Sequence, residues 1–176
     1  MRLETITGQQ VIETERFTLR PVQKSDAGQL RMYAGDKRVA EQTSSIPHPL
    51  PRGVIQAFIE RVQQPDRDED AWVMDRGGDE ILGVISLKRM DRSQSEIGYW
   101  VAPAFWGTGL ASEAVNALLE ANPQNCKTIF AVVFQDNPAS ARVLTNAGFT
   151  YLGDAEHFSV ARDANVATWT YLRKYD

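Results

Sequence analysis

Hydrophobic and polar positions along the chain follow two patterns, and each predicts a kind of secondary structure. Short runs rich in β-branched and aromatic residues predict strands over residues 17–21, 71–74, 81–87, 95–101, 127–133, 151–152 and 166–175. Apolar residues at steps of three and four predict helices between residues 25 and 35, 52 and 62, 109 and 120, and 136 and 148. Residues 1–13 are expected to form a loosely held lead-in.

Local signals at the ends of these elements support the boundaries. Ser25 is expected to cap the first helix, and Gly35 to end it. The last helix is expected to begin at Asn137, an Asx cap followed by proline, and to end at Gly148. A strand that starts at residue 95 should stop near Val101, because the proline two positions later cannot continue a ladder.

The order of the elements predicts the fold class. Gly77 and Gly78 lie between two predicted strands and signal a hairpin, so the first half is expected to be an antiparallel meander. Strand 95–101, helix 109–120 and strand 127–133 have the order of a parallel crossover. No linker rich in Ser, Gly or Pro divides the 176 residues. We therefore predict a single domain over residues 1–176, of the mixed α/β (α+β) class, with a mostly antiparallel central sheet flanked by helices.

The turn between strand 95–101 and the following helix is the strongest candidate for a binding site. A helix start leaves about four backbone N–H groups without partners and carries the positive end of the helix dipole. Gly107 and Gly109 remove the Cβ atoms that would hold a phosphate away from those amides. The turn therefore predicts a cradle for a pyrophosphate.

Other interpretations of the same turn stay open at this point. A P-loop needs a Lys-Ser/Thr pair after its second glycine, and Leu110-Ala111-Ser112 stands there instead. A dinucleotide fold turns directly off its strand, whereas residues 102–106 separate this strand from the glycines. A helix cap with glycines that bind no ligand is the simplest alternative.

Charge and composition narrow the class of partner. A net charge of −4 and a pI near 5.3 argue against a general nucleic-acid binder. No run approaches the length of an apolar membrane span, and the first residues have no secretory pattern, so no membrane partner and a cytoplasmic location are expected. The single cysteine, Cys126, permits no internal disulfide and is expected to be buried.

Several separated segments together resemble the GNAT superfamily of N-acetyltransferases. The coenzyme A motif of that family, Gln/Arg-x-x-Gly-x-Gly/Ala, is similar to residues 106–111 (Trp-Gly-Thr-Gly-Leu-Ala). Trp106 departs from the general motif but resembles the RimJ/RimL branch. The resemblance extends over about residues 14–153, through segments 14–21, 46–49, 137–144 and 147–149.

The resemblance implies acetyl-CoA as co-substrate and a primary amine, on a protein N-terminus or a small molecule, as acceptor. It implies that backbone groups of residues 99–101 pair with the pantetheine arm, that amides of residues 107–111 hold the pyrophosphate, and that the Val101 amide stabilises the oxyanion. The expected contacts to the co-substrate are Tyr99, Trp100, Val101, Trp106, Gly107, Thr108, Gly109, Leu110, Ala111, Ser112, Asn137 and Ser140. The resemblance also places acceptor specificity in residues 43–50.

Two residues are candidates for proton transfer. Many GNAT enzymes protonate the leaving thiolate with a tyrosine, but Leu144 occupies that position here. The resemblance to the RimJ/RimL branch makes Ser140 the candidate acid, although a serine near a helix start also bonds its own helix backbone. Glu96 is the candidate base, because alternation places it on the strand face opposite Tyr99; a solvated carboxylate at a strand end is the alternative. A role as helix cap would by itself account for an asparagine at position 137.

Some tempting residues carry less weight. His48 and His157 have no connected partners, so no metal site is expected. Residues 66–70 are expected to be a solvated acidic loop, with attraction of a cationic acceptor as the alternative. Glu113 is expected to face solvent or to brace the glycine turn. A catalytically weak acyl-CoA-binding or sensing domain, and a regulator that binds NAD through the glycine turn, are the alternatives to an enzyme. The protein is expected to be a monomer or a homodimer.

Overall fold

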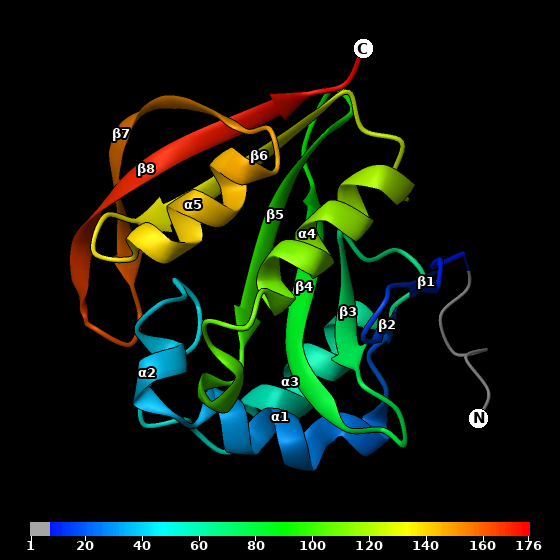
Figure 1. Ribbon diagram of the computed structural model, residues 1–176. Coiled ribbons are helices and arrows are strands. Elements are labelled where there is room, and N and C mark those ends of the chain that lie inside the picture. The colour runs from blue at the N-terminus through cyan, green and yellow to red at the C-terminus, as the bar shows by residue number, and fades with distance from the viewer. Residues whose placement is uncertain (1–7) are drawn as a thin grey trace.

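Eight strands form one sheet in the computed structural model, which describes residues 8–176 (Figure 1). They lie in the order β1-β2-β3-β4-β5-β6-β8-β7. Over these residues, every neighbouring pair is antiparallel except β5 and β6, which are parallel. The mixed, mostly antiparallel sheet is thus confirmed. The strands are β1 (Ile12–Glu13), β2 (Thr18–Pro21), β3 (Glu69–Asp75), β4 (Ile81–Arg89), β5 (Gln94–Val101), β6 (Thr128–Phe134), β7 (Thr150–Ser159) and β8 (Ala164–Lys174).

Helices cover both faces of the sheet. Figure 1 shows α4 in front of strands β3 to β5 and α3 behind them. Alternate residues of β3 enter two separate cores: Trp72 packs with residues of α4 and α5, and Val73 packs with residues of α1 and α3. The helices are α1 (Ala27–Ala34), α2 (Lys37–Ala40), α3 (Val54–Val62), α4 (Leu110–Ala121) and α5 (Pro138–Asn146), with short 3-10 turns η1 (Lys24–Asp26) and η2 (Pro103–Phe105).

The sheet opens between its two parallel strands. Residues 94–97 of β5 pair with residues 128–131 of β6, and the pairing ends there. Beyond that point β5 stays with β4 as far as Val101, and β6 stays with β8 as far as Phe134. The last residues of β5 and β6 therefore face a gap instead of each other.

The structure corrects two expectations about local elements. Ser25 does not cap the first helix: α1 begins at Ala27 after a 3-10 turn, and the buried Asp26 accepts hydrogen bonds from the Gln23 amide and from Arg20. Residues 12–13 are not a loose lead-in, because they pair with β2 as strand β1. Residues 1–7 of that expected lead-in lie outside the described residues.

Two further elements, α2 and β7, lack the regular hydrophobic pattern from which their full length could be predicted. Helix α2 spans four residues and has no periodicity to detect; the side chain of Asp36 caps it by accepting from the Arg38 amide. Strand β7 was expected only at residues 151–152 but runs to Ser159. It is an edge strand with mostly exposed residues, so the alternation that marks a half-buried strand is absent.

Candidate active site

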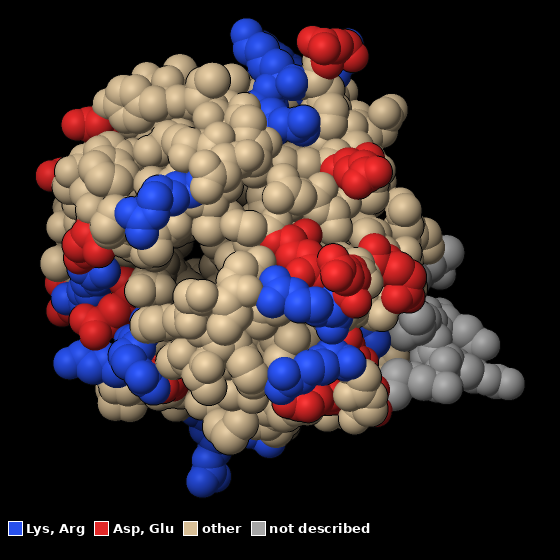
Figure 2. Space-filling model, viewed as in Figure 1, with Lys and Arg blue, Asp and Glu red and all other residues tan. Residues whose placement is uncertain are grey.

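A cavity of about 880 Å³ lies where β5 and β6 separate, and residues from both faces of the sheet line it. Leu110 of α4 and Ser140 of α5 contribute from one face, and Leu30 of α1 and Phe58 of α3 from the other. Figure 2 shows a hollow on the face toward the viewer, rimmed mainly by uncharged side chains. The gap in the sheet thus connects the two layers of helices.

The glycine turn forms one wall of this cavity. Gly107 and Gly109 have φ angles of +76° and +83°, in the left-handed region that favours glycine. Gly109 is the N-cap of α4, and no side chain caps this helix. The first backbone N–H groups of α4 therefore have no partner within the helix and carry its positive dipole end. Gly107 and residues 109–112 line the cavity, so an anion in the cavity could accept hydrogen bonds from these amides.

Arg16 braces this turn from a distant part of the sequence. Its backbone N–H and its Nε donate to the Glu113 carboxylate at 2.9 and 2.6 Å, and its Nη1 donates to the Thr108 carbonyl at 2.8 Å. Burial raises the pKa of Glu113, but the hydrogen bonds from Arg16 outweigh it and leave the pKa below its ordinary value. The expectation that Glu113 braces the turn is confirmed. The sequence alone did not identify Arg16 as its partner.

The free edge of β5 forms a second wall. The Ala102 N–H donates to Leu82 on the β4 side at 2.8 Å, so by alternation the backbone groups of Val101 and Tyr99 are directed to the gap. The Val101 carbonyl accepts a hydrogen bond from Trp106 Nε1 at 2.7 Å. Trp106 therefore ties the end of β5 to the glycine turn, which brings the free strand edge and the uncapped helix end into one site.

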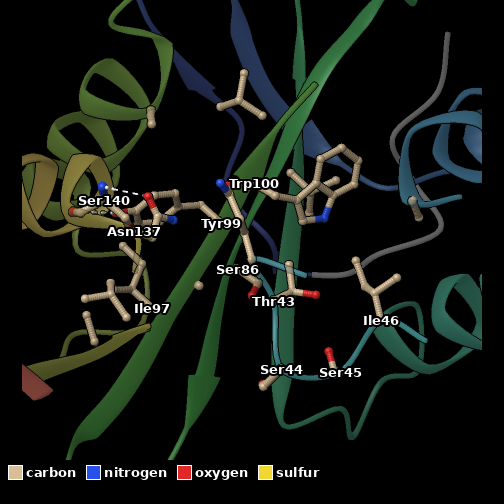
Figure 3. Close-up of a pocket in the computed structure, with 18 of the residues that line it drawn as sticks. Thr43, Ser44, Ser45, Ile46, Ser86, Ile97, Tyr99, Trp100, Asn137 and Ser140 are labelled. Atoms are coloured by element: carbon tan, nitrogen blue, oxygen red, sulfur yellow. Dashed lines mark hydrogen bonds between the residues drawn. The ribbon is translucent and has the colours of Figure 1, made fainter. Parts of the chain in front are cut away.

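Ser140 and Tyr99 meet in the wall formed by α5. The Asn137 side chain accepts from the Ser140 amide at 3.3 Å, which confirms Asn137 as the helix cap. The Ser140 Oγ lies 2.7 Å from the Tyr99 hydroxyl. Figure 3 shows the Tyr99 side chain extending toward Asn137 and Ser140. Burial raises the pKa of Tyr99 to about 12, although the Ser140 hydrogen bond opposes this shift. Ser140 thus lines the cavity, and its hydroxyl partner is a side chain of the central strand.

The opposite side of the cavity combines apolar and charged groups. Trp100 points away from Tyr99 in Figure 3 and packs edge-on against Tyr33, with ring centroids 6.3 Å apart. Glu96 lies on the same strand face as Trp100 and is exposed at the cavity wall, opposite Lys88 of β4. The predicted orientation of Glu96, away from Tyr99, is confirmed.

Comparison with known proteins identifies the family. Residues 16–150 match the model described as an acetyltransferase (GNAT) domain, which is well over half of the chain. The chain belongs to the GNAT acetyltransferase family.

Individual relatives of this GNAT domain agree with that assignment. It is 28% identical over 169 residues to the uncharacterized N-acetyltransferase p20 of Bacillus licheniformis, which covers 92% of this chain and 94% of that protein. It is 32% identical over 102 residues to a ribosomal-protein-serine acetyltransferase of Escherichia coli (strain K12), with 56% and 57% of the two chains covered. A structure of RimL, a ribosomal-protein acetyltransferase in complex with coenzyme A, has the same fold, with a TM-score of 0.82 at 19% identity, covering 95% of this chain and 99% of that one.

The loop after α2 covers the Trp100 side of the cavity in this GNAT domain. Thr43, Ser44, Ser45 and Ile46 line the cavity, where the resemblance had placed acceptor specificity (Figure 3). The turn between β7 and β8 holds this loop: the Val160 N–H donates to the Ser44 carbonyl at 3.1 Å.

Arg162 fixes the start of the same loop. Its Nε and Nη2 donate to the Glu41 carbonyl at 3.0 and 2.7 Å, and its guanidinium pairs with Asp136. The hydrogen bond from Arg162 keeps the pKa of Asp136 below its ordinary value. Arg162 thus ties together the segments that follow α2, β6 and β7, beside the cavity.

Some predicted residues lie elsewhere or in other roles. Thr108 does not line the cavity, because its hydroxyl donates to the Phe105 carbonyl and its own carbonyl accepts from Arg16. His48 is absent from the lining, whereas His157 belongs to it and lies 3.1 Å from the Thr168 hydroxyl. Cys126 is buried, as expected.

The expectation of a solvated acidic loop at residues 66–70 is wrong for Asp70. The first residues of β3 carry Asp70 into the interior, where its carboxylate accepts from Arg67 and Arg89, both at 2.7 Å. Buried charge requires such pairing. Asp68 and Glu69, by contrast, line the cavity. Over residues 8–176, no cluster of His, Cys, Asp and Glu suits a metal ion, and no helix is long and apolar enough to span a membrane.

Proposed function

We propose that this GNAT domain transfers an acetyl group from acetyl-CoA to a primary amine by direct attack. The observation that carries the proposal is the cavity through the split sheet, because it joins the uncapped glycine turn to a second chamber on the other face. A two-substrate transfer needs such a passage, with a donor held on one side and an acceptor on the other.

The donor side offers groups that match each part of coenzyme A. The amides at the start of α4 suit the pyrophosphate, since an anion there completes hydrogen bonds that the helix leaves open. The free edge of β5 suits the pantetheine arm, whose amides can pair with it as an added strand. Val101 offers its backbone N–H, which faces the gap, to the oxyanion. The coenzyme A complex of RimL, which shares the fold, supports this placement.

The acceptor side suits an amine attached to a partly apolar body. Ile46, Leu50 and Phe58 line it together with Trp100, and the carboxylate of Glu96 lies at its wall. A carboxylate there attracts an ammonium group and can accept the proton that must leave before attack. Both protein N-termini and small-molecule amines fit this description, and the ribosomal-protein acetyltransferase among the relatives supports the former.

The groups at the cavity support direct attack. No cysteine of the described chain lines it, and Cys126 is buried beside Ser95. A covalent enzyme intermediate would need an activated nucleophile with an adjacent base. In the direct reaction Glu96 takes a proton from the ammonium group, through water, and the neutral amine then forms the C–N bond. Ser140 supplies a proton to the sulfur as the C–S bond breaks.

Calorimetric titration and a thiol-release assay test the proposal. The purified protein is titrated with acetyl-CoA, coenzyme A and NAD, and then assayed for thiol release with peptide N-termini and small amines. Binding of both coenzyme A forms but not NAD, followed by amine-dependent thiol release, supports the enzyme. Binding without release would indicate a sensing domain, and preference for NAD would refute coenzyme A as the ligand of the glycine turn.

Arg16→Gln should weaken coenzyme A binding about 3- to 10-fold, roughly the loss of one charge-assisted hydrogen bond at a solvated site. The guanidinium braces the turn through Thr108 and lies 3.4 Å from the place that a Cβ on Gly109 would take. Calorimetry on Arg31→Gln provides the control, because Arg31 is an exposed arginine of α1 that does not line the cavity. Equal affinity of the two variants would show that the brace does not organise the cradle.

Glu96→Gln should lower kcat by about 10- to 100-fold near neutral pH while leaving the KM for acetyl-CoA within about twofold. The loss should shrink as pH rises, because more of the free amine is then already neutral. Glu120→Gln, an exposed carboxylate of α4 outside the cavity, is the matched control. A pH–rate profile identical to that of the wild type would assign Glu96 no part in proton removal.

A further inference from the structure

The Tyr99 side chain has no role in the chemistry described so far, although it reaches the residue proposed as acid. Its hydroxyl lies 2.7 Å from Ser140 Oγ and 3.3 Å from the Ser140 carbonyl oxygen. We propose that Tyr99 and Ser140 form a two-hydroxyl proton relay, in which Tyr99 donates to Ser140 so that Ser140 can donate to the departing sulfur. This inference rests on the proposed acetyl transfer and assigns its leaving-group step.

The position of the pair supports this direction of transfer. Tyr99 and Ser140 both line the cavity, where the free edge of β5 faces the first turn of α5 (Figure 3). The amide of Ser140 is already held by Asn137, so the first turn is fixed and its hydroxyl has a defined position. Ser140 belongs to the helix that borders the gap, whereas the side chain of Tyr99 packs against the apolar core. Ser140 is therefore the member placed to reach a ligand.

The environment of Tyr99 keeps its phenol protonated. Tyr99 packs against the apolar cluster that includes residues of α4 and α5. Burial is the main reason that its pKa stands at about 12, and the opposing hydrogen bond is from Ser140. No charged side chain of residues 8–176 is among the causes of the shift. At neutral pH the phenol is consequently protonated, so it can donate a hydrogen bond and transfer its proton.

The relay explains how the thiolate is protonated although Leu144 stands on α5 where many GNAT enzymes have a tyrosine. Leu144 is fully buried and cannot donate a proton. In the relay, the C–S bond breaks, its electron pair stays on sulfur, and sulfur takes the proton of Ser140. Ser140 recovers a proton from Tyr99, and the phenolate regains one from water before the next turnover. The phenol of Tyr99 on β5 thus supplies the proton that a tyrosine at the position of Leu144 would otherwise supply.

Substitution and fluorination at position 99 test the relay. Tyr99→Phe should lower kcat about 10-fold and leave the KM for acetyl-CoA within about twofold. In a Ser140→Ala background the same change should cost little, because residues that act as a unit are not additive. A fluorotyrosine at position 99 keeps the hydroxyl but lowers the phenol pKa. It should restore the rate at neutral pH and move the alkaline loss of activity to lower pH, since a phenolate cannot donate. Tyr151→Phe and fluorotyrosine at position 151, on the exposed edge strand, are the controls.

The outcomes separate this inference from the proposed function. Wild-type protein without amine-dependent thiol release would overturn both. Active wild-type protein with unchanged kcat in Tyr99→Phe would overturn the relay alone. The relay would also be overturned if Tyr99→Phe lowered kcat but the fluorotyrosine protein kept the wild-type pH profile. In that case the Tyr99 hydroxyl would only position Ser140 and would not transfer a proton.

Discussion

Gly109→Glu is expected to abolish measurable binding of coenzyme A. The substitution places a side chain and a negative charge at the N-cap of α4, where the amides proposed to hold the pyrophosphate begin. It also forces a non-glycine residue to adopt a φ of +83°, which costs about 1–2 kcal/mol in the free energy of unfolding. Calorimetry on the folded variant, with its melting temperature recorded, measures the two effects separately.

Gly53→Glu is a control with the same backbone strain. Gly53 is the N-cap of α3, has a φ of +85°, and is exposed outside the cavity. Both variants should lose similar stability, but only Gly109→Glu should lose affinity. Retained affinity in Gly109→Glu would exclude the phosphate cradle, and equal losses of affinity would attribute the effect to general destabilisation.

Ser140→Ala is expected to lower kcat about 100-fold and to leave the KM for acetyl-CoA within about twofold. Removing a general acid affects the transition state, whereas the backbone groups proposed to hold the donor are unchanged. The backbone of α5 should persist, because the Asn137 cap bonds the amide of residue 140 and not its hydroxyl. Steady-state kinetics with a saturating amine measures both parameters.

Thr145→Ala controls for removal of a hydroxyl from the same helix. Thr145 is exposed, and its hydroxyl bonds the Arg142 carbonyl within α5. Its variant should turn over at the wild-type rate. If Ser140→Ala also turns over normally, neither Ser140 nor a relay through it protonates the leaving group.

Local hydrogen-bonding rules account for what could be predicted from the sequence. The glycine turn, the strand before it and the helix after it involve contacts between near neighbours in the chain, so their residue types suffice to indicate them. The Asn137 cap and the hairpin at Gly77 and Gly78 are of the same kind. The resemblance to the GNAT family then joined these local motifs into one expected site.

The missed features depend on contacts between residues far apart in the chain. Tyr99 and Ser140 are 41 positions apart, and Arg16 and Glu113 are 97 apart. A tyrosine within a strand is ordinarily explained by packing, so no local signal marked its hydroxyl. Likewise, nothing in residues 42–46 indicated that the turn after β7 would hold them over the cavity.

The sequence by itself determined the elements, the mixed sheet and the turn suited to an anion, because periodicity and capping are set by neighbouring residues. Only the tertiary structure decided which hydroxyl bonds that of Ser140, which arginine braces the glycine turn and which residues line the cavity together. These depend on the point at which β5 leaves β6 and on the helices packed across that gap. Such long-range geometry follows from how the whole core packs, which no single stretch of residues encodes.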